Sequence, residues 1–317
     1  MGKTSFSLWI DYLDQDFIRD DLPEYLERGA RGVTTNPAIF RQAIVGKASY
    51  KARIDDLRQK GLNGKRLYEA LAIVDAQNAA DALKPYFDGA DGFVSIEVDP
   101  ALSSDAAGTI EEARRLYRAI GRENVMIKIP ATGEGFIAIK ELLQSGVPIN
   151  ATLVFSPDQT RRTLRAAKNG ETPMVISVFV SRFDRAIDER LPRELRAKTG
   201  IINAANCYNL VAEADRKNVR VLFASTGVKE SALSADYYIR ELFGDNLVNT
   251  APLAAIDAFL DGKDRTKRIP IAQDTIETFL AKIEKLGADF ERLCDKLLAE
   301  GLAQFERAFS DILSELA

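Results

Sequence analysis

Lys128 is the residue of this sequence best suited to chemistry, because it interrupts an apolar run. Residues 125–133 are rich in β-branched and apolar side chains and end in proline and glycine, as a short buried strand does. Lysine is rarely buried unless it is paired or functional. Desolvation would lower the pKa of Lys128 and free its amine to attack a carbonyl carbon. We hypothesise a Schiff-base lysine; the alternative is a strand-end lysine whose stem is packed and whose amine is in water.

The sequence contains no histidine, which narrows the chemistry. Histidine-bound zinc or iron and the Ser-His-Asp and Cys-His nucleophile systems are excluded, so carboxylates, lysine, hydroxyl groups or a cofactor must carry any catalysis. Neither a glycine-rich dinucleotide motif nor a phosphate-binding loop motif follows a predicted strand. Cys207 and Cys294 are too far apart to indicate a disulfide framework and are interpreted as reduced core thiols. Nucleotide cofactors therefore have no visible site, and we predict no metal because histidine ligands are lacking.

The composition is that of a globular protein: of its 317 residues, 46% are hydrophobic and 28% are charged. Its formal net charge is −4 and it has no basic block, so we expect no nucleic-acid partner. An anionic ligand would have to be bound by a few basic residues at its own site. No apolar run approaches the roughly 20 residues of a membrane span, and the N-terminus lacks a secretory pattern. These features predict a cytoplasmic protein without a membrane partner.

Short apolar runs alternate with amphipathic stretches along the whole chain, with no linker composition between them. This pattern predicts a single domain over residues 1–317, an α/β (β/α)8 barrel with extra helices after the second strand and at the C-terminus. A doubly wound open sheet is the alternative. The predicted strands are 6–10, 32–37 with a turn, 93–97, the run around Lys128, 149–155, 175–180, 219–224 and 247–250. The predicted helices are 17–28, 48–60, 66–84, 110–120, 136–143, one beginning after Ser156, helical material up to 217, then 237–242, 253–260, 275–286 and 290–316.

Polar residues recur on one face of successive predicted strands. Successive strand side chains point to opposite faces, so Ser95 and Glu97 share a face, as do Ser177 and Phe179. The opposite faces are apolar; on the fifth strand, Asn150 and Thr152 lie opposite Ile149, Ala151 and Leu153. In a barrel the polar face points inward and its chemistry lies at the carboxyl ends of the strands. We expect one polar cluster around Lys128; the alternative is a buried polar layer with a structural role only.

These strand motifs together resemble those of the transaldolase family, in order and over almost the whole chain. They are residues 32–37 (GVTTNP), 95–99 (SIEVD), 127–132 (IKIPAT), 150–156 (NATLVFS) and 176–182 (ISVFVSR). The resemblance implies a cofactor-free (β/α)8 enzyme of the non-oxidative pentose phosphate pathway. Such enzymes move a dihydroxyacetone unit between sugar phosphates through a lysine Schiff base. The implied partners are small-molecule sugar phosphates, with the protein a monomer or a homodimer.

The resemblance also implies roles for individual catalytic residues. Lys128 matches the Schiff-base lysine, and Asp11, at the end of the first strand, matches the base that takes the C4 hydroxyl proton of the ketose. Glu97 matches a carboxylate that moves protons through a water positioned by Thr152. The transfer is expected to follow ping-pong kinetics, since the three-carbon unit stays bound to the enzyme.

Substrate binding is implied for a second group of residues. Asn36, Asn150 and Ser177 match residues that hydrogen-bond the sugar, and Phe179 is expected to line the barrel near the Schiff base. Arg182 matches a phosphate-binding arginine. In the loop after the seventh strand, where many transaldolases carry an arginine, this chain offers Lys229 as the second cation. Asn36 is also compatible with a plain turn residue, and Lys229 with a solvated surface lysine.

Three other functions remain open at this point. A fructose 6-phosphate aldolase is a lyase of the same superfamily, but those relatives are shorter and carry Tyr where this chain has Phe179 and Gln where it has Glu97. A non-catalytic sugar-phosphate binding barrel would give no reason to keep Lys128, Glu97 and Asp11 together. A metal-dependent aldolase would require histidine ligands, which the sequence lacks.

Overall fold

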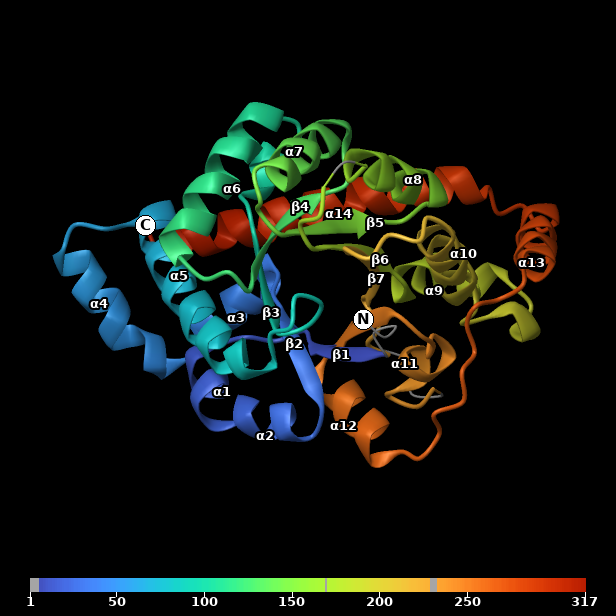
Figure 1. The fold of residues 1–317 in the computed structure, drawn as a ribbon, viewed down its shortest axis with the longest axis horizontal. Coiled ribbons are helices and arrows are strands. Elements are labelled where there is room, and N and C mark those ends of the chain that lie inside the picture. Colours follow the sequence, from blue (N-terminus) through green and yellow to red (C-terminus); the bar gives the residue numbers. More distant parts are fainter. Residues whose placement is uncertain (1–5, 169, 229–232) are drawn as a thin grey trace.

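The computed structural model describes residues 6–168, 170–228 and 233–317, and these form a closed barrel of eight parallel strands. The strand order around the barrel is the order in the sequence, β1 to β8, which confirms the predicted (β/α)8 architecture (Figure 1). The strands are β1 (Ser7–Ile10), β2 (Ala30–Thr34), β3 (Phe93–Glu97), β4 (Val125–Pro130), β5 (Ile149–Val154), β6 (Met174–Phe179), β7 (Val219–Ala224) and β8 (Leu247–Ala251).

Helices cover the outside of the barrel, and several of them begin at a polar side chain that caps the first turn. Ser156 and Gln159 form a reciprocal capping box at the start of α8, and Thr132 caps α7. The helices are α1 (Gln15–Asp20), α2 (Leu22–Glu27), α3 (Pro37–Gly46), α4 (Lys51–Gln59), α5 (Gly64–Leu83), α6 (Ala106–Ile120), α7 (Gly133–Gln144), α8 (Pro157–Ala166), α9 (Ser181–Ile187), α10 (Thr199–Glu213), α11 (Tyr237–Glu241), α12 (Leu253–Asp261), α13 (Gln273–Lys285) and α14 (Phe290–Glu315). Single 3-10 turns occur at Ala48–Tyr50, Lys84–Tyr86, Pro100–Leu102, Asp188–Arg190 and Arg193–Leu195.

Two helical predictions differ from the structure. The single helix predicted over residues 17–28 is two helices, α1 and α2, and Pro23 lies in the first turn of the second, where proline is favoured. No helix is predicted between the turn that ends at residue 37 and the helix that starts at 48, but Pro37–Gly46 forms α3, whose N-cap is the Asn36 side chain accepting from Ile39 N at 3.1 Å. The extra helices after the second strand are therefore α3, α4 and α5.

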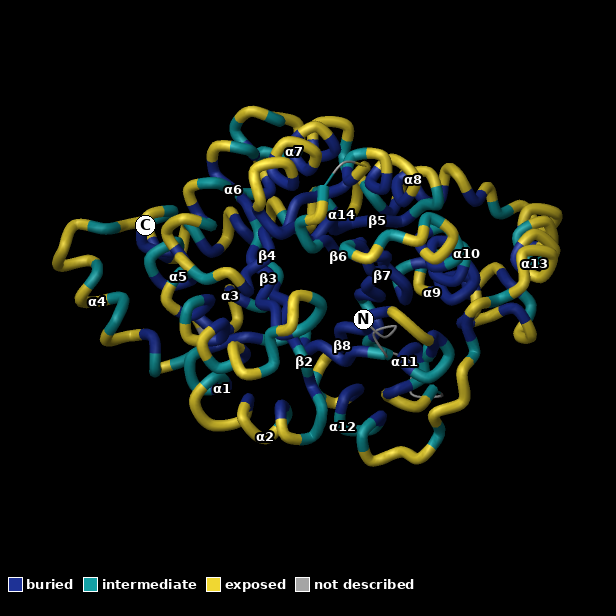
Figure 2. The backbone as a smooth tube through the Cα atoms, viewed as in Figure 1, coloured by how far each residue is buried: buried dark blue, intermediate teal, exposed yellow. Residues whose placement is uncertain are grey.

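At most strand positions the side chain points to the predicted face of the sheet. The buried hydrophobic residues form two clusters that show this. Ile127, Ile129 and their counterparts pack in the cluster between barrel and helices, whereas Phe93 and Met126 belong to the cluster inside the barrel. Figure 2 shows this buried centre surrounded by exposed helix surfaces on α4 and α13. The inward face is thus the one that carries the polar residues.

Leu153 is the exception, because its predicted outward position is wrong. The register between β5 and β6 shifts between Ala151 and Val154, and Leu153 takes a φ of 55°. This bulge turns Leu153 into the inner cluster and Val154 into the outer one. The bulge follows Thr152 directly, at the carboxyl end of the strand.

The amino-terminal end of the barrel is closed by packing around Trp9. A Cβ on Gly32 would lie 2.5 Å from the Trp9 ring, so the indole needs glycine at that position. Trp9 Nε1 donates to Asp91 Oδ1 at 2.9 Å, and the buried Arg220 lies 3.3 Å from the same oxygen. These contacts are structural and leave the opposite end of the barrel for a site.

The carboxyl ends of the strands are crossed by α14, the long red helix of Figure 1. It contacts α3, α5, β5 and α9, which lie around that end of the barrel. Gly301 permits this approach, because a Cβ there would lie 3.1 Å from Leu153 Cδ2 and 3.5 Å from Arg182 Nη1. Among the described residues, no helix has the length and apolar character that crossing a bilayer requires.

Candidate active site

A cavity of about 250 Å³ opens at the carboxyl end of the barrel, between the strand ends and α14. It gathers side chains from strands far apart in the sequence, as the parity of the strands predicted. Its lining residues are Asp11, Thr34, Asn36, Ala38, Lys128, Thr152, Ser177, Phe179, Arg182, Arg185, Ala224, Ser225, Thr250, Gln304, Phe305 and Ala308.

Lys128 is buried at the base of this cavity, with a residue exposure of 5%. Its Nζ lies 2.7 Å from Glu97 Oε1 and donates to the Thr35 carbonyl at 2.6 Å. Glu97 and Lys128 are register partners on β3 and β4, so the two strands set this separation. The strand-end lysine with its amine in water is therefore ruled out by the burial of Lys128.

Glu97 and Thr152 enclose a second, water-sized space beside the amine. This space of about 10 Å³ is lined by Glu97, Lys128 and Thr152 on the barrel side and by Leu302 and Phe305 of α14 on the other. Among the described residues, neither Glu97 Oε2 nor Thr152 Oγ1 has a hydrogen-bond partner, although both atoms are buried. Burial raises the pKa of Glu97, and the positive charge of Lys128 opposes that rise.

Asp11 lies directly after β1 and belongs to a hydroxyl network across the cavity wall. Thr34 Oγ1 donates to Asp11 Oδ1 at 2.9 Å and lies 2.6 Å from Thr250 Oγ1. Burial raises the pKa of Asp11, whereas the charge of Lys128 and the Thr34 hydrogen bond lower it. A buried carboxyl group with a raised pKa that lines the same cavity as a buried amine has the features expected of a general base.

The three predicted hydrogen-bonding residues take different positions. Asn36 lines the cavity, but its amide oxygen caps α3, so its NH₂ group is the part available to a ligand. Ser177 also lines the cavity and donates to Asn150 Oδ1 at 2.6 Å. Asn150 is fully buried one layer below, where it also donates to Ser95 Oγ at 3.1 Å. The structure thus places Asn150 behind Ser177 and not on the cavity wall.

Two arginines of α9 mark the open end of the cavity. Phe179 ends β6, and the Arg182 guanidinium lies 5.2 Å from its ring centroid. Burial and the nearby positive charge of Arg185 lower the pKa of Arg182 to about 10. Lys229, the second cation proposed from the sequence, lies outside the described residues.

Several lining residues were missed by the sequence analysis. Thr34 and Thr250 form the hydroxyl network that holds Asp11. Arg185 lies one helical turn after Arg182, and this spacing could have indicated that both side chains share one face of the helix. Gln304 and Phe305 reach the cavity from α14, at the far end of the chain. No local pattern could have indicated them, because only the crossing of α14 brings them there.

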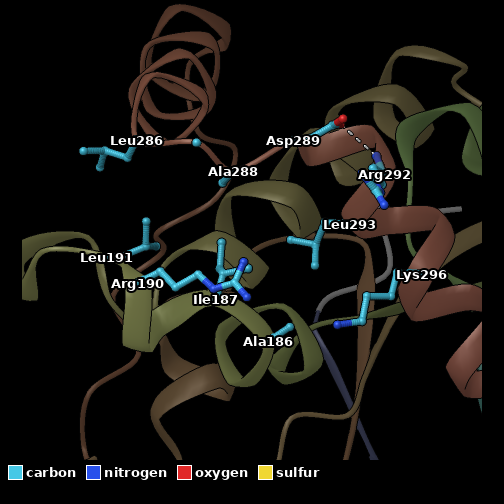
Figure 3. Close-up of a pocket in the computed structure, with 11 residues that line it drawn as sticks. Ala186, Ile187, Arg190, Leu191, Leu286, Ala288, Asp289, Arg292, Leu293 and Lys296 are labelled. Carbon is cyan, nitrogen blue, oxygen red and sulfur yellow. Dashed lines mark hydrogen bonds between the residues drawn. The ribbon is translucent and has the colours of Figure 1, made fainter.

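A second cavity, of about 330 Å³, lies where α9 and its following turn meet the junction of α13 and α14 (Figure 3). Its walls combine Ile187 and Leu293 with the exposed cations Arg190, Arg292 and Lys296. Figure 3 shows the Asp289 carboxylate engaged with the backbone of Arg292, a contact of 3.0 Å that caps α14. None of the predicted catalytic residues lines this cavity, so its greater size does not make it the active site.

No metal centre accompanies either cavity. Within residues 6–168, 170–228 and 233–317, no group of three or more Cys, Asp or Glu side chains is arranged to hold a metal ion.

Comparison with known proteins relates this arrangement to characterised relatives. A family model described as transaldolase/fructose-6-phosphate aldolase matches residues 8–316. A transaldolase of Helicobacter pylori (strain Shi470) is 42% identical over 313 residues, which cover 98% of this chain and 98% of that protein. A transaldolase of Campylobacter jejuni (strain RM1221) is 43% identical over 330 residues, with 98% and 99% coverage. The family match therefore includes nearly the whole barrel and α14.

Proposed function

The chain belongs to the transaldolase family and catalyses the transaldolase reaction, and we propose that Lys128 carries this reaction as a Schiff-base lysine. The reaction reversibly transfers a dihydroxyacetone unit from sedoheptulose 7-phosphate to glyceraldehyde 3-phosphate, giving erythrose 4-phosphate and fructose 6-phosphate. The observation that supports the role of Lys128 most strongly is its buried amine, held beside Glu97 and open to the cavity.

The first step is attack of the neutral Lys128 amine on the C2 carbonyl carbon of the ketose. The C–N bond forms as the carbonyl π bond breaks; the nitrogen then loses a proton and the oxygen gains one, which gives a carbinolamine. A second proton on that oxygen lets it leave as water, and the nitrogen lone pair forms the C=N bond of the iminium ion. Glu97 is placed to move these protons, through a water held in the small space that it shares with Thr152. The unpartnered Glu97 Oε2 and Thr152 Oγ1 support this assignment.

The second step is cleavage of the C3–C4 bond. Asp11 takes the proton of the C4 hydroxyl, the C4–O bond becomes a carbonyl, and the electrons of the C3–C4 bond move into the iminium. The first aldose then leaves, and an enamine of the three-carbon unit remains on Lys128. The raised pKa of Asp11 supports its role as the base, because a more basic carboxylate accepts this proton more readily.

The remaining lining residues hold the substrate. We assign hydrogen bonds with the sugar hydroxyls to Asn36 and Ser177, with Asn150 as the residue that orients Ser177. Arg182 takes the phosphate at the open end of the cavity, where a guanidinium matches phosphate geometry. Phe179 forms an apolar wall between these two regions, and Lys229 stays a candidate second cation.

Transfer is favoured over simple cleavage by two residues that contact the reaction region. Phe179 has no hydroxyl with which to position a hydrolytic water, and Glu97 provides a carboxylate beside the amine. The test is a coupled assay of glyceraldehyde 3-phosphate release from fructose 6-phosphate, with and without erythrose 4-phosphate. We expect continued release only with the acceptor, and without it no more than one equivalent per enzyme, because the three-carbon unit then stays on Lys128; equal continued release without the acceptor would identify a fructose 6-phosphate aldolase-type lyase.

The proposed setting of the reaction follows from its substrates. Sugar phosphates fit the family, and we propose that the enzyme meets them in the cytoplasm without a cofactor. We propose a monomer or a homodimer as the working assembly. Sedimentation of the purified protein at several concentrations distinguishes the two.

A further inference from the structure

Arg182 and Arg185 face the same end of the active-site cavity from successive turns of α9. Arg182 lies deeper, beneath α14, whereas Arg185 lies at the exposed rim. Two guanidinium groups at one end of a cavity provide forked donors from two directions. Such a pair matches the several oxygens of a phosphate group better than one arginine does.

Neither arginine forms an ion pair among the described residues. Glu300 acts on Arg182 and Asp184 on Arg185 from a distance only, and Asp184 accepts from Gly200 N and from the Tyr238 hydroxyl. Burial lowers the pKa of both guanidinium groups, and the charge of Arg185 further lowers that of Arg182. Placing two like charges together without a carboxylate in direct contact costs free energy, which a bound dianion would recover.

Ser225 adds a hydroxyl group to the same end of the cavity. It follows β7 and takes a φ of 56°, a strained conformation for serine. Its Oγ lies 3.0 Å from Ser181 Oγ and 3.5 Å from Arg185 Nη2. The backbone strain thus accompanies a side chain that is directed towards the arginines.

We infer that Arg185 is the second cation of the phosphate subsite and that it acts with Arg182 and the Ser225 hydroxyl to select phosphorylated over unphosphorylated sugars. The inference rests on the proposed function for the class of substrate. It differs from the sequence-based assignment, which gave the second cation to Lys229. The helix after β6 supplies both charges, and the loop after β7 supplies a hydroxyl.

The binding experiment uses sorbitol 6-phosphate, which has no carbonyl group and cannot form a Schiff base. Isothermal titration of the wild-type protein measures its affinity, with sorbitol as the unphosphorylated control. Arg185→Gln should weaken sorbitol 6-phosphate binding about 10- to 100-fold, the effect of losing a charge-assisted hydrogen bond. Arg185→Lys keeps the charge but loses the forked pair of donors, so its affinity for sorbitol 6-phosphate should lie between those of the wild type and Arg185→Gln.

Two further variants test whether the loss of affinity is specific to Arg185 or follows from removing any positive charge. Arg190→Gln removes an exposed arginine that lines the other cavity, and it should leave the affinity unchanged. Lys229→Gln tests the competing assignment directly. A loss of affinity with Lys229→Gln but not with Arg185→Gln would overturn the inference, as would equal losses with Arg185→Gln and Arg190→Gln.

Steady-state kinetics distinguish a binding role from damage to α9. With fructose 6-phosphate, Arg185→Gln should raise KM by about the factor seen in titration, with kcat nearly unchanged, and turnover of unphosphorylated fructose should be unaffected. An equal loss with both ketoses would contradict the inference. Because sorbitol 6-phosphate binding does not require catalysis, a wild-type protein that binds it through Arg185 without transferring would refute only the proposed function.

Discussion

Lys128 and Glu97 are register partners on β4 and β3, and Lys128 Nζ lies 2.7 Å from Glu97 Oε1. Their side chains are 6% and 8% exposed. Such a buried pair is a poor source of stability, because desolvation of both charges offsets much of their attraction. Its value is chemical: a carboxylate in contact with an amine can exchange protons with it while the amine forms and loses a bond to carbon. We therefore propose that the pair serves the reaction more than the fold.

Thr152→Val tests the water-mediated role of Glu97. The substitution keeps the shape of a buried side chain but removes Oγ1, which has no hydrogen-bond partner among the described residues. We expect the free energy of unfolding to change by about 1 kcal/mol or less, because Oγ1 bonds no protein group among the described residues. Adduct formation on Lys128 should slow by about 10-fold or more, as for a lost proton-transfer contact. An unchanged rate of borohydride-trapped adduct would show that Thr152 does not position the water.

Asp11→Asn should lower activity by about 10²- to 10⁴-fold, the usual range for loss of a general base. The measurement is kcat for transfer from fructose 6-phosphate, with Asp274→Asn as a surface control. Since catalysis requires ionised Asp11 and burial raises its pKa, wild-type activity should fall on the acid side at a pH above the ordinary carboxyl value of 3.8. Retention of full activity by Asp11→Asn would remove Asp11 from the mechanism.

The same substitution should stabilise the protein at neutral pH. The folded protein binds the Asp11 proton more tightly than the unfolded chain, so stability is lost as pH rises from 3.8 through the raised pKa. Asparagine removes this cost. Thermal unfolding should therefore show a higher Tm for Asp11→Asn than for wild type at pH 8, with a difference that shrinks at pH 4. A lower Tm at pH 8 would mean that attraction to Lys128 outweighs the burial of Asp11.

Phe179→Tyr should raise the release of free dihydroxyacetone relative to transfer. Phe179 lines the cavity, and a hydroxyl on its ring can position a water for hydrolysis of the three-carbon intermediate. The matched control is Phe305→Tyr, which places a hydroxyl on the α14 wall of the same cavity. Both products are measured in one reaction. An unchanged ratio in folded Phe179→Tyr protein, or the same rise in both variants, would exclude a specific role for Phe179.

Gly301→Val tests whether the close approach of α14 shapes the cavity. A Cβ at Gly301 would lie 3.1 Å from Leu153 Cδ2, and Leu153 is held by the bulge at a φ of 55°, so we expect α14 to move outward. The KM for fructose 6-phosphate should rise about 10-fold, because misplaced binding groups lose contacts with the substrate. Ala303→Val, on the exposed face of the same helix, controls for the helix propensity of valine. Equal KM values in the two variants would mean that the approach of α14 is not important for binding.

The sequence was sufficient to predict the features that depend on local periodicity. Alternation along each strand placed Lys128 and Glu97 on one inward face, and the strand count predicted the barrel that brings Asp11 to them. Leu153 departed from this rule because a bulge reverses the alternation, and a single sequence carries no strong signal for a bulge.

Features that depend on contacts between distant segments were beyond prediction. Gln304 and Phe305 reach the cavity because α14 crosses the barrel, and the amphipathic pattern of α14 is the same whether it crosses a barrel or meets another subunit. The family resemblance assigns Asn150 to the substrate, and alternation along β5 gives only its face; depth along the strand decides between contact with a ligand and contact with Ser177.

Borohydride reduction in the presence of fructose 6-phosphate tests the role of Lys128 most directly. Reduction converts the bound imine to a stable amine, and peptide mass spectrometry then identifies the modified lysine. We predict a three-carbon adduct on Lys128, absent from folded Lys128→Met protein together with all turnover and retained in the exposed-site control Lys140→Met. An adduct on Lys140 or Lys229 instead, or turnover that persists in Lys128→Met, would contradict the Schiff-base mechanism.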